Sequence, residues 1–293
     1  MQGHQARSDR SLSWHRYLTF DKFGKRFRQF SYLVANIPHH VRLAGALGTT
    51  PGGSAVRWKY LGDYLSLDLD SAQRRSALAG HYRTVSRIAQ GAPVFSKGFE
   101  VWRNEVVEGR PPLAITIEPA KLAPMEGELQ LTFSFHTDIF ALTFAFCPGP
   151  LFGVVDECAI LVGGVQGAFG SFDEIREATK LNADISPPNM LMLALRALAK
   201  VAGASVILCV GEENQVSVGY ARDRIKLDYP RLWLEQGGEP FGRYYCIPLD
   251  QPQKPLSEVP RTHRSRARRR RERRMALMAG MEARIATGLA AQA

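Results

Sequence analysis

Residues 159–170, AILVGGVQGAFG, decide how the rest of the chain is interpreted. An apolar run of the kind that forms a buried strand ends abruptly in glycines. The spacing of Gly164, Gly167 and Gly170 matches neither a dinucleotide-binding fingerprint nor a P-loop, and no P-loop lysine follows. The backbone N–H groups of such a turn can still bind a phosphate where a helix begins. Two interpretations stay open, a ligand-binding loop and a plain strand-to-helix turn.

Two helices and a strand are predicted after these glycines. Ser171 and Glu174 have the spacing of a capping box, although Glu174 and its neighbour Asp173 would also repel a phosphate at this helix start. A strongly apolar helix is predicted over residues 187–202, because prolines open it and a glycine follows it. Residues 204–210, ASVILCV, have the pattern of a strand buried on both faces. A strand, a crossover helix and a second strand form a parallel pair.

Upstream of the glycines, the sequence has the period of antiparallel strands. Apolar and polar residues alternate over residues 99–107, 112–120 and 127–149. Residues 55–90 instead have helical periodicity, with Asp70 as a candidate cap. The predicted fold class is therefore α/β (α+β). It has a mixed, mostly antiparallel sheet, N-terminal helices and one buried crossover helix.

Composition divides the chain into three parts. Residues 1–54 form a polar and basic N-terminal extension, residues 55–250 a single α/β domain, and residues 251–293 a Pro-rich exit followed by an Arg-rich helical tail. The N-terminus lacks the apolar middle of a signal peptide, and no apolar run approaches the length that spans a bilayer. We therefore expect a cytoplasmic protein, with the inner-membrane surface as a candidate peripheral location.

The net charge of +10 is concentrated in one segment. Residues 261–274 hold nine arginines and one glutamate, a charge of +8, which leaves +2 for the rest of the chain. Such a run can neutralise nucleic-acid phosphates or attract an anionic inner-membrane surface, or it can simply be a solvated helix end. The candidate contact residues are Arg264, Arg266, Arg268, Arg269, Arg270 and Arg271.

Candidate catalytic carboxylates follow the buried strand at 204–210. Glu212 and Glu213 would lie at the carboxyl end of a parallel strand, where ligands gather in open α/β sheets, and either could act as a general base. An ordinary polar turn explains the same residues. The segment at 228–238, DYPRLWLEQGG, predicts either an aromatic lip over a pocket or an edge hairpin that packs its aromatic side chains on the core.

The remaining polar candidates have structural interpretations. We expect His81 to be a core or boundary histidine and His136 with Asp138 to form a polar turn between strands, although a base with its orienting carboxylate is conceivable. No metal site is expected, because the cysteines lack metal-ligand spacing and fit buried free thiols better. The cysteines are Cys147, Cys158, Cys209 and Cys246.

The chain resembles a known family. The segments ILVGGVQG, ATKLNADISPPNMLMLALRALAKVAGA, RIKLDYPRLWLEQGG, YYCIPL and EVPRTHRSRARRR look like the bacterial VirK/YbjX family in this order, over about residues 55–275. The resemblance implies an association with stress and virulence, namely tolerance of host cationic peptides and a response to DNA damage. It implies no established biochemical activity.

The order of elements also resembles the acyl-CoA-dependent N-acyltransferases of the GNAT fold. In that fold an antiparallel meander ends in a phosphate-binding turn, and a helix, a parallel strand and a closing hairpin follow. The resemblance implies acyl-CoA as cofactor, with Glu212 or Glu213 as base and Tyr220 or Tyr229 as acid. Phe169 stands where the motif of that family has glycine. The pyrophosphate would lie on the backbone of Gly163, Gly164, Val165, Gln166 and Gly167.

Overall fold

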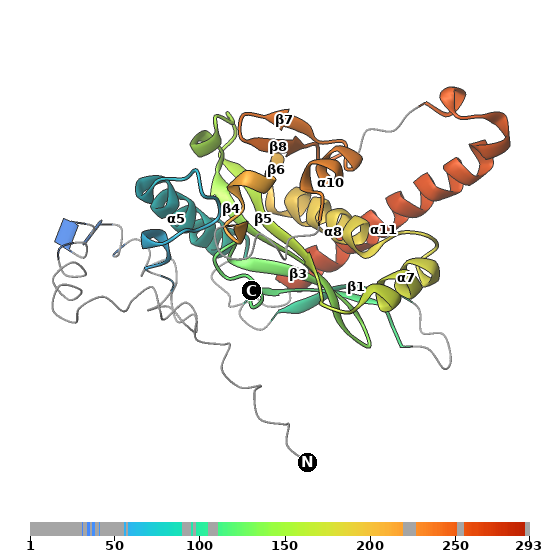
Figure 1. Ribbon diagram of the computed structural model, residues 1–293, viewed down its shortest axis with the longest axis horizontal. Coiled ribbons are helices and arrows are strands. Elements are labelled where there is room, and N and C mark those ends of the chain that lie inside the picture. Colours follow the sequence, from blue (N-terminus) through green and yellow to red (C-terminus); the bar gives the residue numbers. More distant parts are fainter. Residues whose placement is uncertain are drawn as a thin grey trace, which may run out of the picture.

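The computed structural model describes residues 58–89, 98–104, 111–218, 227–250 and 255–290, with single positions at 31, 34, 35, 37, 38, 41, 56 and 95. The N-terminal extension lies almost wholly outside the described residues, and the candidate acid Tyr220 lies outside them as well. The described part of the chain is arranged around one sheet (Figure 1).

The sheet has eight strands in the order β1-β2-β3-β4-β5-β6-β8-β7. Every neighbouring pair is antiparallel except β5 and β6, which are parallel. This confirms the predicted mixed, mostly antiparallel fold. The strands are β1 (Phe99–Arg103), β2 (Ala114–Pro119), β3 (Leu129–Phe135), β4 (Thr137–Pro148), β5 (Cys158–Gly167), β6 (Val206–Val210), β7 (Glu239–Phe241) and β8 (Tyr244–Ile247).

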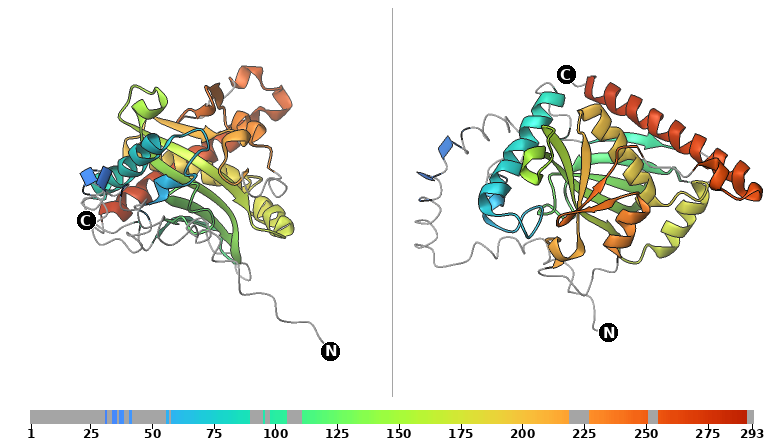
Figure 2. Two further views of the ribbon diagram at one scale, coloured as in Figure 1. Left: turned by 60° about the vertical axis from the view of Figure 1, so that its left-hand side comes forward. Right: turned by 90° about the horizontal axis from the view of Figure 1, so that it is seen from above.

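Two cores lie on opposite faces of the sheet, one beneath α8 and one beneath α5 (Figure 2). Along β5, Ile160 and Val162 belong to the core with α8, whereas Ala159 and Leu161 belong to the core with α5. The central strands are therefore buried on both faces, as the unbroken apolar pattern predicts. The described α-helices are α5 (Ser71–Ile88), α7 (Phe172–Leu181), α8 (Pro187–Ala202), α10 (Tyr229–Glu235) and α11 (Arg264–Ala290).

The ends of α5 and α8 follow from local sequence signals. The Asp70 carboxylate accepts hydrogen bonds from the N–H groups of Ala72 and Gln73 at 2.7 and 2.8 Å, and the Gln73 side chain accepts one from the Asp70 N–H group. Prolines begin α8, and Gly203 ends it at φ 70°, a conformation that glycine adopts without strain. These caps fix both helices in the predicted places.

Two local predictions were wrong. Ser171 makes no capping hydrogen bond within the described structure, because its backbone (ψ 28°) is not in the extended conformation of a capping residue. Within residues 228–238, Tyr229–Glu235 forms helix α10, so the edge hairpin, one of the two interpretations of this segment, is wrong. The Asp228 side chain caps this helix by accepting a hydrogen bond from the N–H group of Arg231 at 2.9 Å. A hairpin of β7 and β8 follows this helix.

Helix α11 is one continuous helix, as predicted, but only part of it projects from the body. Its second half packs Met281, Ile285 and Leu289 into the core with α8, and it also lies along β1. Its first half carries the arginine run and extends beyond the body (Figures 1 and 2). The domain boundary after residue 250 stays a prediction, yet the last turns of α11 belong to the same core as the sheet.

Candidate functional site

The most unusual place in the sheet is where its parallel strands part. Strands β5 and β6 pair from Ala159 with Val206 to Val162 with Cys209, and β5 then continues alone on this side to Gly167. The register between β4 and β5 shifts at the same point, which makes Gly163 the extra residue of a β-bulge. Beyond the bulge, no strand of the described ranges lies beside this edge of β5.

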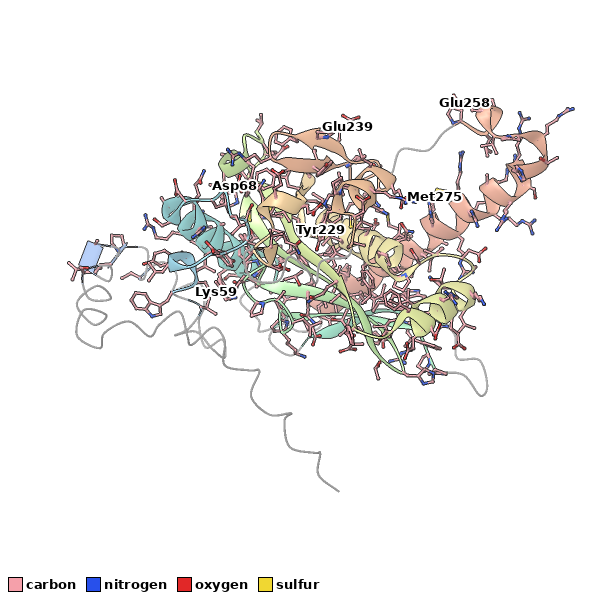
Figure 3. The ribbon with its side chains drawn as sticks, in the orientation of Figure 1. Lys59, Asp68, Tyr229, Glu239, Glu258 and Met275 are labelled. Atoms are coloured by element: carbon pink, nitrogen blue, oxygen red, sulfur yellow. The ribbon has the colours of Figure 1, made fainter. Side chains whose placement is uncertain are left out.

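Helix α10 fills the space between the parting strands with two aromatic side chains. The Tyr229 hydroxyl accepts a hydrogen bond from the N–H group of Val165 at 2.9 Å and donates one to the carbonyl of the same residue at 2.8 Å. On the other strand, Trp233 Nε1 donates to the carbonyl of Val210 at 2.9 Å. The Tyr229 hydroxyl thus takes the place of a strand partner for β5 (Figure 3 labels Tyr229).

A buried carboxyl group lies against the glycines of the bulge. A Cβ atom at Gly164 would lie 2.7 Å from Cδ of Glu126, and one at Gly163 would lie 2.8 Å from its carbonyl carbon. Only glycine leaves room for Glu126, whose exposed fraction is 2%. Its Oε1 accepts hydrogen bonds from Gln215 Nε2 at 3.3 Å, from the Ser217 N–H group at 3.2 Å and from the Ser217 hydroxyl.

Burial changes the proton affinity of this cluster. Desolvation raises the pKa of Glu126 to about 7, and the hydrogen bonds from Ser217 and Gln215 only partly oppose it. A carboxyl with such a pKa can both accept and release a proton at neutral pH. Burial also raises the pKa of Tyr229, and its hydroxyl is bonded to Val165 and to Gln215 Nε2 at 2.7 Å. The Tyr229 hydroxyl therefore links Val165 on β5 to Gln215.

The structure brings together part of the site that the sequence predicts. Val165 is bonded to Tyr229, and Gly163 and Gly164 lie against Glu126. Glu212 and Glu213 lie exposed on the short 3-10 helix η3 (Glu212–Asn214). Gln166 and Gly167 are exposed at the end of β5.

Sequence reasoning missed Glu126, Gln215 and Ser217. The one signal in the sequence was Gly127, which lies between two glutamates. In the structure this position requires glycine, because a Cβ atom there would lie 2.6 Å from the carbonyl oxygen of Phe144.

The second glutamate of this segment belongs to a structural cluster. Lys59 Nζ pairs with Glu128 at 2.7 Å and donates to the carbonyl of Pro124 at 2.8 Å, and the Tyr82 hydroxyl donates to the same carboxylate. Nearby, His81 Nδ1 accepts a hydrogen bond from the N–H group of Phe146 at 3.1 Å. Burial lowers the pKa of His81 to about 4. His81 is therefore a neutral core histidine, as predicted.

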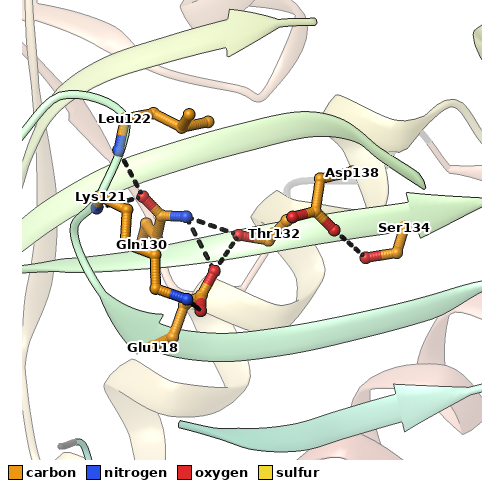
Figure 4. A network of polar contacts seen from close by, with 7 residues as sticks. All are labelled: Glu118, Lys121, Leu122, Gln130, Thr132, Ser134 and Asp138. Carbon is orange, nitrogen blue, oxygen red and sulfur yellow. Dashed lines mark hydrogen bonds and ion pairs between the residues drawn. The ribbon is translucent and has the colours of Figure 1, made fainter. Parts of the chain in front are cut away.

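Figure 4 shows two other polar groups, on β2, β3 and β4. Gln130 accepts hydrogen bonds from the N–H groups of Lys121 and Leu122 and donates to Glu118 and Thr132, which closes the loop between β2 and β3. Beside it, Asp138 accepts a hydrogen bond from Ser134 at 2.7 Å. The intervening His136 has φ 58°. This is the polar turn that the sequence predicts, and it leaves no orienting carboxylate for His136.

Five of the six predicted arginine contacts are exposed, and several are anchored to the body. Arg266 and Arg270 both pair with Asp184, at 3.1 and 3.4 Å. Arg264 donates to the carbonyl groups of residues 257 and 259, and Arg269 donates to the hydroxyl of residue 265. Arg268 is exposed, and Arg271 is half-buried. No helix in the described ranges is long and apolar enough to cross a bilayer.

The fold and the site define the class of protein. It is an α/β protein in which the two parallel strands of a mixed sheet separate beside a buried carboxyl group. The chain belongs to the family described as a protein of unknown function, DUF535, whose sequence profile matches residues 28–287. This is the VirK/YbjX family, so the resemblance seen in the sequence is confirmed.

A Haemophilus influenzae protein described as uncharacterized is 26% identical over 178 residues, which cover 58% of this chain. The chain spans 57% of the length of that relative. No solved structure matches, so the likeness to acyltransferases remains an analogy of architecture.

Proposed function

We propose that the chain is an acyl-CoA-dependent N-acyltransferase in a bacterial family associated with stress and virulence. One observation carries the proposal: a buried carboxyl group lies against the glycine bulge where the parallel strands part. In the acyltransferase architecture, cofactor and reacting groups lie at this place in the sheet. The association with cationic-peptide tolerance and DNA damage rests on the family resemblance alone.

Glu126, rather than Glu212 or Glu213, is the base in this proposal. An ammonium group must lose a proton before its nitrogen can attack a thioester, and a carboxyl group with a pKa of about 7 can accept that proton at neutral pH. Oε1 of Glu126 already accepts three hydrogen bonds, so Oε2, which faces Gly164, is the oxygen left for the proton. Glu212 and Glu213 are exposed to water on η3.

In this proposal the pyrophosphate binds further along the turn than the resemblance to the GNAT fold implies. The carboxyl group of Glu126 lies in front of Gly163 and Gly164, where it would repel an anion. Residues 166–170 are exposed, and the first N–H groups of α7 have no side-chain cap from Ser171. The N–H groups of Ala168 and Ser171 are already donated, to the carbonyls of Ile139 and Ala168, so the pyrophosphate would take those of residues 169, 170 and 172. Asp173 and Glu174 in the first turn of α7 oppose an anion there and lower the expected affinity. Bound acyl-CoA would supply the activated acyl group.

Calorimetric titration with coenzyme A, acetyl-CoA and a long-chain acyl-CoA tests this site. Ala168 is exposed within the turn, so Ala168→Asp adds a negative charge, and Ala168→Asn is the matched neutral control. We expect at least about tenfold weaker binding for the aspartate variant and little change for the asparagine variant, because a like charge at close range costs more than about 1.4 kcal/mol. If none of the three compounds binds, the proposal is refuted.

A second function is favoured by the distribution of arginines on α11. Residues 264–274 carry arginine on every side of the helix, with no apolar stripe between them. A helix that lies in a bilayer interface needs such a stripe, whereas a helix between nucleic-acid phosphates does not. We therefore propose nucleic acid as the anionic partner of this segment, with the inner-membrane surface as the competing outcome.

Deletion of the whole tail cannot test this function, because α11 contributes Met281, Ile285 and Leu289 to the core. Replacing three exposed arginines on α11 by glutamine keeps the helix intact, and three exposed arginines elsewhere provide a control of equal charge. The slope of log affinity for duplex DNA against log salt should fall by about three only in the first variant. Equal slopes in both variants, or binding to anionic vesicles alone, would contradict nucleic-acid binding. The test set is Arg268, Arg269 and Arg273, and the control set is Arg83, Arg176 and Arg231.

A further inference from the structure

A cavity of about 340 Å³ lies away from the parting strands. It is framed by the segment before α5, by the 3-10 helix η2 (Gly149–Phe152) and by the turn between β7 and β8. Its volume is at the small end of the range for ligand pockets. Neither the glycine bulge nor Glu126 lines it, so whatever it binds is independent of the acyltransferase proposal.

One wall of the cavity carries an oriented carboxylate. Asp68 Oδ1 accepts hydrogen bonds from the Tyr244 hydroxyl at 2.8 Å and from the Ser66 hydroxyl, and Oδ2 lies 3.0 Å from the same Tyr244 oxygen. The Tyr244 ring packs edge-on against Phe152 at 5.3 Å. A carboxylate has about four acceptor sites, so Asp68 keeps capacity for another donor. Figure 3 labels Asp68, which lies three residues before the first residue of α5.

The opposite charge comes from the turn between β7 and β8. Arg243 lines the cavity, and the described ion pairs include none between it and Asp68. The backbone of this turn is held in place, because the Arg243 carbonyl accepts a hydrogen bond from Asn214 Nδ2 at 3.2 Å. A guanidinium group binds carboxylates through paired donors. The lining of one small cavity therefore includes a residue with a carboxylate, Asp68, and a residue with a guanidinium group, Arg243.

Most of the rest of the lining is apolar, and Gln73 adds one uncharged polar side chain. Leu151, Phe152 and Phe241 contribute side chains, and Phe241 is 38% exposed although it is a large apolar residue. A simple organic cation would meet the charge of Arg243, and a simple anion would meet that of Asp68. A zwitterion with an apolar substituent satisfies both charges and covers the apolar wall.

We propose that this cavity binds a free α-amino acid with an apolar side chain. The ammonium group donates to Asp68, the carboxylate accepts from Arg243, and the side chain packs on Phe152 and Phe241. The site requires both charges on one small molecule. This distinguishes it from the proposed cofactor site at residues 166–170, which binds phosphate groups.

Titration of the full chain with L-phenylalanine or L-leucine, followed by calorimetry or by ligand-observed NMR, tests the proposal. Phenylethylamine lacks the carboxylate and 3-phenylpropionate lacks the ammonium group, so each should bind at least about tenfold more weakly than L-phenylalanine. Asp68→Asn and Arg243→Gln should each weaken binding by a similar factor. Asp68→Asn keeps the side chain's shape and an acceptor for Tyr244, so the fold is retained.

Glu239→Gln and Arg231→Gln are matched controls, since both residues are exposed, lie outside the cavity lining and lose the same charges. Their affinities should stay within about twofold of that of the unmodified chain, since residues outside the cavity make no contact with the ligand. Three results would overturn the proposal: no saturable binding of either amino acid at millimolar concentration, equal affinity for phenylethylamine, or unchanged affinity in Asp68→Asn. Loss of acyl-CoA binding would not contradict the proposal that the cavity binds an amino acid.

Discussion

Replacing Gly164 by alanine tests the contact between the glycine bulge and Glu126. A Cβ atom there would meet only the side chain of Glu126, at 2.7 Å from Cδ and closer still to Oε2. The carboxyl group must therefore move, and removal of the side chain in Glu126→Ala should relieve the clash. Gly163 is the matched control. Its Cβ atom would meet the backbone of Glu126, which no side-chain replacement removes.

The size of the effect follows from the bonds that a displaced carboxyl group loses. Glu126 accepts hydrogen bonds from Gln215 Nε2 and from the N–H and hydroxyl groups of Ser217. At about 1 kcal/mol for each bond, Gly164→Ala should lower the free energy of unfolding by about 3 kcal/mol. Glu126→Ala loses the same bonds. The double variant should therefore lose about 3 rather than about 6 kcal/mol, a coupling energy of about 3 kcal/mol.

Urea unfolding followed by tryptophan fluorescence measures the free energies of both double-mutant cycles. In the control cycle of Gly163→Ala with Glu126→Ala, the two losses should add to within about 0.5 kcal/mol. The placement of the Glu126 carboxyl group is refuted by additive losses in the Gly164 cycle, or by equal coupling in the two cycles.

Three further predictions concern the same fold. Tyr229→Phe removes the bridge to Val165 and Gln215 and should lower the free energy of unfolding by about 2–3 kcal/mol, again measured in urea. Because burial raises the pKa of Glu126 from 4.5 to about 7, the folded protein binds this proton more tightly than the unfolded chain. The resulting stabilisation of about 3 kcal/mol is complete below pH 4.5 and is lost as the pH rises through 7. The difference in unfolding free energy between the unmodified chain and Glu126→Gln should therefore change by about 3 kcal/mol between pH 4.5 and pH 8. A difference that stays constant over this range would contradict the burial of Glu126. Ile285→Ala should destabilise by about 2–5 kcal/mol and lower the melting temperature, whereas Met275→Ala, at a position 59% exposed on the same helix, should change it little.

The predictable parts of this fold are those set by neighbours in the sequence. Asp70 caps α5, and Pro187 and Gly203 delimit α8, through contacts within a few residues. Alternation of apolar and polar residues indicates the strands of the meander, and an unbroken apolar run indicates β6. Such signals are local, so one sequence suffices to place these elements and to infer that β5 and β6 are parallel.

The candidate site could not be predicted, because it depends on contacts between distant segments. The burial that raises the pKa of Glu126 arises only in the folded chain. So do its hydrogen bonds to Gln215 and Ser217, which lie about 90 residues later in the sequence. The bulge at Gly163 follows from the register with β4, which no local pattern encodes. The error at residues 228–238 is of another kind. Asp228 and Pro230 signal a helix start, but the aromatic residues of this segment also fit an edge hairpin packed on the core.

The position of α11 has a consequence for how this chain folds. Strand β1 is at the edge of the sheet, and an uncovered edge strand can pair with another chain. Part of its cover comes from α11, whose Arg284 pairs with Glu100 at 3.1 Å across 184 residues of sequence. During synthesis, β1 leaves the ribosome long before the helix that shields it. The nascent chain therefore passes through a period in which its first strand is open to aggregation, and folding ends only when α11 docks.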